Sequence, residues 1–188
     1  MDTLIIYSHP YDKSFNHAIL ENVEGELMQK EQHFNLVDLY KDHFNPAYTS
    51  EELALFKDGG TTDPLVVQYQ KFLTNANHVI FIFPIWWNDT PAMIKGFIDK
   101  VMKKKFAYEV GKTGVVGHLT HIEKATILTT STSPTWYLKL FCSNAIKKVF
   151  INATLKQLGI NHITWQNMGN IDKSTAQDRQ NFLNKIDL

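Results

Sequence analysis

The chain has 188 residues, of which 44% are hydrophobic, and its nineteen basic residues balance nineteen acidic ones. This length suits one domain with a sizeable core, and zero formal charge leaves no global field that would attract nucleic acid or an anionic membrane surface. The single cysteine, Cys142, excludes an intramolecular disulfide and a CxxC metal site. We therefore expect one domain over residues 1–188 that binds no nucleic acid.

The first part of the chain predicts a strand, a loop, a helix and a second strand. Leu4–Tyr7 is a short apolar run that ends before His9-Pro10, and apolar residues recur at helical spacing after Ser14. Phe34–Leu39 is the second apolar run, and residues 47–62 form a polar stretch that closes at a glycine pair. We expect that polar stretch to be a surface insertion.

The middle of the chain predicts a helix, a buried strand and another helix. Pro64 opens a helical stretch to about Thr74, and His78–Phe83 is a continuous apolar run. A strand that is apolar on both faces is typical of the centre of a parallel sheet covered by helices on both sides. Pro91 suits the first position of the next helix, and Lys103–Lys105 suit its solvated carboxyl end.

The last part predicts two further strands. Ala125–Thr129 is the fourth apolar run, residues 137–158 have helical periodicity, Ile160–Trp165 offers a fifth strand and Thr175–Ile186 a closing helix. Parallel neighbouring strands need crossover connections, so strands that alternate with helices indicate a doubly wound α/β sheet. In such sheets the ligand lies beyond the carboxyl ends of the strands.

Three loops leave those carboxyl ends. In the first, residues 8–16, Ser14 and Asn16 begin a helix and could hold a phosphate, although Ser14 is equally explained as a helix cap. No GxGxxG or GxxxxGK[ST] motif is present in this loop, which argues against a dinucleotide site of the Rossmann type and against a nucleoside triphosphatase.

The second and third loops are rich in aromatic and hydroxyl side chains. Trp86 and Trp87 stand in the second loop, where they could line a planar cofactor such as a flavin ring, or else pack into the core or a dimer contact. The third loop, residues 129–137, could donate hydrogen bonds to a ring carbonyl or a phosphate, or satisfy its own backbone.

Together these motifs resemble the NAD(P)H:quinone oxidoreductase family, which includes DT-diaphorase. They occur in the family's order and spacing over nearly the whole chain. The matching segments are His9-Pro10, Ser14-Phe15-Asn16, Asp38-Leu39-Tyr40, Phe44-Asn45-Pro46, Phe83-Pro84, Trp87, Pro91-Ala92, Lys95-Gly96-Phe97, Asp99, Val101, Phe106-Ala107-Tyr108 and Thr129-Thr130. The resemblance implies a flavodoxin-like three-layer sandwich with a five-stranded parallel sheet in the order 2-1-3-4-5.

The resemblance also implies roles for individual residues. The residues expected to bind the flavin are His9, Ser14, Phe15, Asn16, Pro84, Ile85, Trp86, Trp87, Thr129 and Thr130, with Arg179 near an adenylate if the flavin is FAD. Tyr137 is expected to close the edge of the ring, and Tyr108 to reach the active site of a partner subunit in a homodimer with shared sites. FMN is favoured over FAD because the chain lacks much of the longer relatives' carboxyl-terminal extension.

The implied activity is flavin-dependent transfer of a hydride from NAD(P)H to a quinone-like acceptor, in a ping-pong sequence. The chain departs from the family pattern at two places. Ser131-Thr132 replaces a glycine pair, and Ser143 stands where the mammalian enzymes have a histidine that handles charge on the reduced flavin. Asn144 or a backbone amide could take over that role. The alternatives are an azo or nitro reductase, an electron-carrying flavodoxin, and a flavin-bearing regulatory subunit of a membrane transporter.

The sequence gives no sign of a metal site, an export signal or a membrane span. The eight histidines show no metal-binding spacing, and seven of them are expected to be structural or solvated, His9 being the exception. Met1 leads directly into a short strand, and no apolar stretch approaches the roughly 18 residues of a transmembrane helix. We expect a cytoplasmic protein without membrane insertion.

Overall fold

The central sheet has five parallel strands. The computed structural model describes residues 2–188 and gives the strand order β2-β1-β3-β6-β7. The strands are β1 (Thr3–Tyr7), β2 (Phe34–Asp38), β3 (His78–Pro84), β6 (Lys124–Thr130) and β7 (Ile163–Met168). This order confirms the flavodoxin-like arrangement, since β6 and β7 are the fourth and fifth strands of the sheet.

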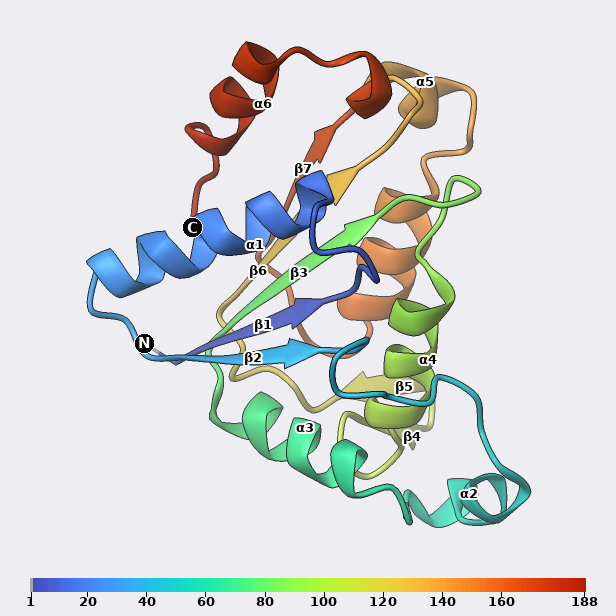
Figure 1. Cartoon of the computed structure of the whole chain (residues 1–188). Coiled ribbons are helices and arrows are strands. Elements are labelled where there is room, and N and C mark those ends of the chain that lie inside the picture. Colours follow the sequence, from blue (N-terminus) through green and yellow to red (C-terminus); the bar gives the residue numbers. More distant parts are fainter. Residues whose placement is uncertain (1) are drawn as a thin grey trace.

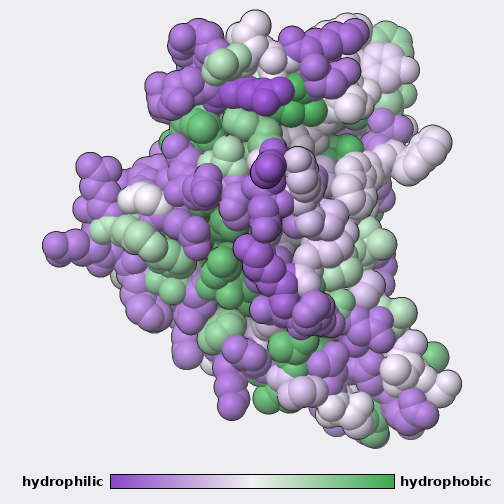
Figure 2. Space-filling model, in the orientation of Figure 1, coloured by the Kyte–Doolittle hydropathy of each residue, from purple (hydrophilic) through white to green (hydrophobic). Residues whose placement is uncertain are grey.

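Helices cover both faces of the sheet (Figure 1). On one face lie α1 (Phe15–Gln29) and α6 (Ala176–Leu183); on the other lie α3 (Pro64–Asn75), α4 (Ala92–Val101) and η2 (Ile146–Leu155). Side chains alternate along each strand, so Ile5 packs on the α1 side whereas Leu4 and Ile6 pack on the α4 side. Hydrophilic side chains cover most of the molecular surface seen in Figure 2, and small hydrophobic patches lie between them.

The predicted fifth strand begins too early. β7 starts at Ile163, whereas the apolar run starts at Ile160. The Ile160 amide donates a 3.1 Å hydrogen bond to the Leu155 carbonyl, so Ile160 belongs to the end of the preceding helix. Its side chain is fully buried there, and a short apolar run cannot by itself separate a buried helix end from a strand.

The single helix predicted over residues 137–158 is two helices. The first is α5 (Thr135–Leu140), and the second, η2, has hydrogen bonds of the i→i+5 type that continue to Lys156, whose amide donates to Ile151 at 3.0 Å. Between them Ser143 and Asn144 have φ values of 56° and 51°, in the left-handed region that ends a right-handed helix. Apolar periodicity did not reveal this break.

A two-stranded antiparallel hairpin, β4 (Tyr108–Gly111) and β5 (Gly114–Gly117), was not predicted. Its signal is present in the sequence: valine-containing runs flank the two-residue connection Lys112-Thr113, with a glycine on either side. Gly114 has a φ of 143°, which a residue with a side chain rarely adopts.

The polar stretch 47–62 contains α2 (Ser50–Ala54) and the 3₁₀ turn η1 (Phe56–Asp58), and it is anchored to the core. Lys100 Nζ is buried and lies 3.1 Å from Glu52 Oε2 and 2.9 Å from Asp63 Oδ2. It also donates to the Asn45 carbonyl at 2.8 Å. We call Lys100, Glu52 and Asp63 the buried ion cluster; it makes this stretch an integral part of the fold.

The lysines after α4 only partly match the predicted solvated terminus. Lys105 is exposed, but the prediction was wrong for Lys103, which is 1% exposed and donates from Nζ to the Gly60 carbonyl at 2.6 Å. Burial lowers the pKa of Lys103. Its burial follows from the return of the 47–62 stretch over the end of α4, a contact that charge patterning along the chain does not reveal. Within residues 2–188 no helix combines the length and apolar character needed to cross a membrane.

Candidate functional site

The structure brings the three predicted loops together at the carboxyl edge of the sheet. Asn16 Nδ2 donates a buried 2.8 Å hydrogen bond to Thr130 Oγ1, which joins the first loop to the third. The Ile85 amide donates to the Thr130 carbonyl at 2.8 Å, which joins the second loop to the third. The rings of His9 and Trp86 meet edge to face with centroids 6.2 Å apart. We call this region the carboxyl-edge site.

The start of α1 provides an anion-binding geometry. Ser14 is the N-cap, and its hydroxyl accepts from the His17 amide at 3.1 Å. Within residues 2–188 the amides of Phe15 and Asn16 have no hydrogen-bond acceptor, and no acidic residue stands in the first turn of this fifteen-residue helix. Free amides and the positive end of the helix dipole favour a phosphate here.

Buried polar atoms without partners gather around the same loop. In the described part of the chain the Tyr7 hydroxyl, Ser8 Oγ, Asn16 Oδ1 and His17 Nδ1 are buried and form no hydrogen bond. Such atoms are costly in a folded protein unless a ligand or water satisfies them. Sequence reasoning singled out Asn16 but not Ser8, because a serine that follows a strand carries no distinctive signal. Burial raises the pKa of Tyr7 to about 12, so its hydroxyl keeps its proton.

His9 is held as a neutral ring. The Tyr11 amide donates to His9 Nδ1 at 3.1 Å, which requires that nitrogen to carry no proton. Burial lowers the pKa of His9, which favours the same neutral form. The proton therefore resides on Nε2, and His9 can donate one hydrogen bond from that atom.

The second loop is a tight turn with exposed tryptophans. Trp86 and Asp89 exchange two backbone hydrogen bonds of 3.1 Å, and between them Trp87 and Asn88 have φ values of 52° and 66°. Positive φ at both central residues defines a type I′ turn, which is a strained conformation for tryptophan. Trp87 is 98% exposed and Trp86 44%, whereas Pro84 and Ile85 are buried beneath them. Strain of this kind clusters at binding sites.

The two threonines of the third loop face different partners. Thr129 Oγ1 lies 2.8 Å from Asn167 Oδ1 and accepts from Trp165 Nε1 at 2.9 Å, so its hydroxyl is held by β7. Thr130 faces the first loop through Asn16. Ser131, at the predicted glycine position, accepts from Asn167 Nδ2 at 2.9 Å. The hydroxyls of Thr129 and Ser131 therefore brace the loop against β7.

Tyr137 lies in an exposed aromatic cluster on α5. Its ring stacks on Phe141 with centroids 5.5 Å apart and meets Trp136 edge to face at 5.9 Å. Ser143, which replaces the family histidine, is exposed, and Asn144 lines a separate cavity beside η2. Arg179 comes close to the first loop: its guanidinium carbon is 5.9 Å from the Phe15 ring centroid. The same side chain donates to Ser174 Oγ at 2.8 Å and to the Ile171 carbonyl at 3.2 Å, where Ile171 begins the 3₁₀ turn η3 (Ile171–Lys173).

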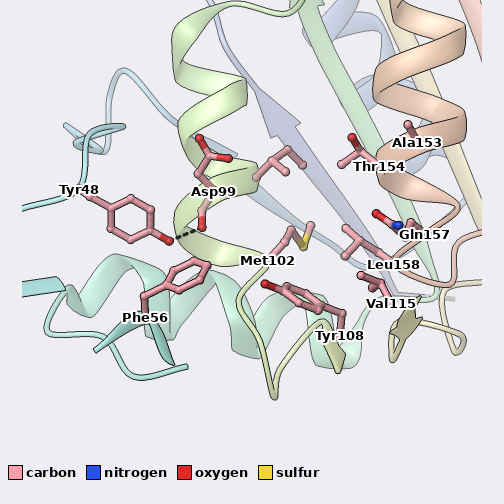
Figure 3. Close-up of a pocket in the computed structure, with 11 residues that line it drawn as sticks. Tyr48, Phe56, Asp99, Met102, Tyr108, Val115, Ala153, Thr154, Gln157 and Leu158 are labelled. Carbon is pink, nitrogen blue, oxygen red and sulfur yellow. Dashed lines mark hydrogen bonds between the residues drawn. The ribbon is translucent and has the colours of Figure 1, made fainter. Parts of the chain in front are cut away.

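Tyr108 is the predicted residue that the structure does not bring to these loops. It lines a cavity of about 330 Å³ between the 47–62 stretch, α4 and η2, into which the rings of Tyr48 and Phe56 also point (Figure 3). A second cavity of about 170 Å³ shares the Ile98 and Asp99 lining and reaches Asp89 and Thr90 in the second loop. A groove therefore runs along α4 from Tyr108 towards the carboxyl-edge site.

Comparison with known proteins agrees with this fold. The sequence model of a protein family described as having a flavodoxin-like fold matches residues 1–187 of this chain. An uncharacterized NAD(P)H oxidoreductase of Haemophilus influenzae is 27% identical over 172 residues, which is 91% of this chain and 85% of that protein. In the human and rat quinone dehydrogenases that also match, the matched segments span only 53% and 44% of those proteins.

Solved structures match over almost the whole chain. Smu.1420 from Streptococcus mutans UA159 is 36% identical with a TM-score of 0.86, over 98% of this chain and 96% of that one. The NAD(P)H:quinone oxidoreductase from Methanothermobacter marburgensis is 25% identical with a TM-score of 0.85, over 98% of this chain and 92% of that one.

Proposed function

The chain belongs to the flavodoxin-like fold family, and from that premise we propose that residues 1–188 form a single flavin-binding domain of an NAD(P)H oxidoreductase that reduces quinone-like acceptors. The names of the relatives supply the reaction class. The proposal rests on three features that occur together at one edge of the sheet. They are a helix N-terminus with free amides, buried polar atoms without partners, and exposed tryptophans.

These features fit the two ends of a flavin. The free amides at the start of α1, with Ser14 beside them, suit the phosphate and the ribityl chain. Trp86, with the turn that carries Trp87, suits a planar ring whose edge accepts hydrogen bonds. When bound, the flavin supplies the hydride chemistry between NAD(P)H and the acceptor. The protein positions both reactants against the ring and limits the access of water.

Individual residues then have defined tasks. Asn16 holds the first and third loops at a fixed separation through Thr130 and presents its unpartnered oxygen to the bound group. His9 presents Nε2–H as a neutral donor, since its Nδ1 is occupied by the Tyr11 amide. Donors of this kind stabilise negative charge on a reduced ring without giving up a proton. Tyr137 forms the aromatic wall on the α5 side, which Phe141 supports.

We propose FMN as the resident flavin. The Arg179 guanidinium is already bonded to Ser174 and to the Ile171 carbonyl, so it closes the end of the first loop instead of extending towards a second phosphate. FAD is the alternative, and it requires Arg179 to leave those partners.

The proposed assembly is a homodimer with shared active sites, because Tyr108 lies at the far end of the α4 groove from the tryptophan loop. A partner packed on the same groove brings its Tyr108 to this chain's carboxyl-edge site. Analytical ultracentrifugation tests the dimer. Tyr108→Phe should retain flavin but change the KM for the acceptor, whereas a monomeric protein with full activity contradicts the shared site. The proposed location is the cytoplasm, because a chain with a single cysteine forms no intramolecular disulfide and suits a reducing compartment.

The decisive experiment is reconstitution followed by reduction. The purified protein is incubated with FMN or FAD, free flavin is removed, and the visible spectrum is recorded before and after anaerobic addition of NADH or NADPH. We expect retained FMN that bleaches with a pyridine nucleotide and recovers when benzoquinone is added. Recovery with an azo dye at a higher kcat/KM would shift the acceptor assignment to azo compounds. A protein that retains neither flavin contradicts the proposal.

A further inference from the structure

Another cavity, of about 330 Å³, is bounded by α5, η2 and the edge strand β7. Lys139, Lys147 and Lys156 line it together with three asparagines. Its apolar lining comes from Ile151, Ile163 and Trp165, and Lys139 Nζ lies 5.6 Å from the Trp165 ring centroid. We call it the basic cavity; it shares no residue of the first or second loop of the carboxyl-edge site.

The charge in the basic cavity is not balanced by the protein. None of the lining residues is acidic. Lys139, Lys147 and Lys156 are exposed, and across residues 2–188 no carboxylate oxygen lies within 4.0 Å of their Nζ atoms. Because the whole chain has zero formal charge, this concentration of cations is a local feature.

The winding of η2 creates the cluster. Lys147 and Lys156 are nine positions apart, which is about two and a half turns of an α-helix and would place them on opposite sides. η2 has i→i+5 bonds instead, and Lys147 near its start and Lys156 just after its end both line the basic cavity.

The lining also contains an unsatisfied acceptor. Asn144 Oδ1 is buried and forms no hydrogen bond with any residue in 2–188, and Asn144 itself holds the left-handed φ of 51° that starts η2. This oxygen has almost no accessible surface, so the Asn144 side chain must turn into the cavity before a ligand hydroxyl can satisfy it; a bare anion would not satisfy it. The basic cavity therefore offers point charges for an anion and an acceptor for a hydroxyl.

We propose that the basic cavity binds a small organic phosphate that carries at least two negative charges and a hydroxyl group, such as a pentose phosphate. Lysine ammonium groups bind phosphate as point charges, whereas recognition of planar carboxylates favours arginine, which this cavity lacks. The volume suits a molecule of this size. The ligand is held by Lys139, Lys147 and Lys156 through its phosphate and by Asn144 through its hydroxyl.

The test is calorimetric titration of the full chain, saturated with FMN so that the anion site at α1 is filled, with ribose 5-phosphate. We expect saturable binding with one molecule per chain. The triple variant Lys139→Gln, Lys147→Gln, Lys156→Gln should lower the affinity at least tenfold. The matched control Lys57→Gln, Lys71→Gln, Lys148→Gln removes the same charge from exposed lysines outside the cavity and should change the affinity less than twofold.

Two further measurements identify the ligand chemistry. Asn144→Gly keeps the left-handed backbone. It should lower the affinity for ribose 5-phosphate but not the affinity for inorganic phosphate. Citrate should bind more weakly than ribose 5-phosphate. Absence of saturable binding, equal losses in the two triple variants, or citrate binding as tightly as the sugar phosphate would overturn the proposal. The titration rests on the proposed FMN binding, which the flavin spectrum checks separately, but its outcomes do not depend on reductase activity, so failure here leaves the proposed reaction untouched.

Discussion

Two groups of buried polar atoms in this protein differ in how they are satisfied. In the buried ion cluster, Lys100 Nζ has three oxygen partners within 3.1 Å, from Glu52, Asp63 and the Asn45 carbonyl. At the carboxyl-edge site, Ser8 Oγ and Asn16 Oδ1 are equally buried but have no partner in the described chain. The polar atoms of the first group find all their partners within the protein, whereas those of the second group need a ligand or water as a partner.

The difference separates residues that build the fold from residues that bind. A buried charge must be paired, since an unpaired one costs several kcal/mol, so the ion cluster locks the 47–62 stretch onto α4. An unpartnered buried hydroxyl or amide oxygen costs about 1–3 kcal/mol, which binding can recover. Substitutions in the first group should therefore reduce stability, whereas substitutions in the second should reduce flavin affinity.

The largest effect is expected from Lys100→Met. It removes the cation but leaves Glu52, which is 3% exposed, as an uncompensated buried carboxylate. Breaking one partner of a buried ion pair costs roughly 3–5 kcal/mol. We expect a loss of this size in the free energy of unfolding by urea, with the FMN content of the folded fraction unchanged.

The matched control is Lys95→Met on the same helix. Lys95 Nζ lies 2.6 Å from Asp99 Oδ1, but both side chains are largely exposed, so its loss should cost less than about 0.5 kcal/mol. Equal losses in the two variants would mean that the buried ion cluster is no more important than a surface pair.

A smaller effect is expected from pH through His78. Its ring is buried, its Nε2 lies 2.9 Å from Thr126 Oγ1, and burial lowers its pKa from 6.5 to about 4. Between these values the unfolded chain binds the proton and the folded chain does not, so stability is full above pH 6.5 and falls as the pH decreases towards 4. Lowering the pH from 7.5 to 5 should cost about 2 kcal/mol.

Urea unfolding at both pH values checks this in the wild type and in His78→Gln, which cannot titrate. The pH dependence should become flatter in His78→Gln by about that amount. A wild-type slope identical to that of His78→Gln would contradict the assignment.

Local patterns predicted the interior strands well because those strands are buried on both faces. His78–Phe83 is a continuous apolar run and Ala125–Thr129 a run of apolar and threonine residues, and both proved to be interior strands of the sheet. The residues that patterns missed depend on contacts between distant segments or on helix winding. Lys103 looks solvated along the chain but is covered by the Gly60 region, and the break between α5 and η2 at Ser143 and Asn144 leaves no mark in the apolar periodicity.

The candidate site shows the same division. The positions of the three loops followed from the topology rule, and the tryptophans and Asn16 followed from composition and resemblance. The partners of each hydroxyl did not, since they are tertiary contacts: Thr129 Oγ1 bonds to β7, whereas Thr130 Oγ1 bonds to Asn16. Residue type alone placed both threonines in one role.

The smallest effect on stability separates the two groups most sharply. Ser8 Oγ has no partner in the described chain, so Ser8→Ala should leave the free energy of unfolding within about 0.5 kcal/mol of wild type. Thr126→Val is its counterpart, because it removes a hydroxyl that His78 uses and should cost about 1–2 kcal/mol.

Flavin affinity should respond in the opposite order. If the Ser8 hydroxyl is satisfied by the flavin, Ser8→Ala weakens FMN binding several-fold, as measured by fluorescence titration, whereas Thr126→Val leaves it unchanged because Thr126 lies near the amino end of β6. A Ser8→Ala variant that loses stability but binds FMN normally would place Ser8 with the structural group. Ser8 would then resemble Thr3 and Asn77, whose buried oxygens also have no partner in the described chain but lie at the opposite, amino edge of the sheet.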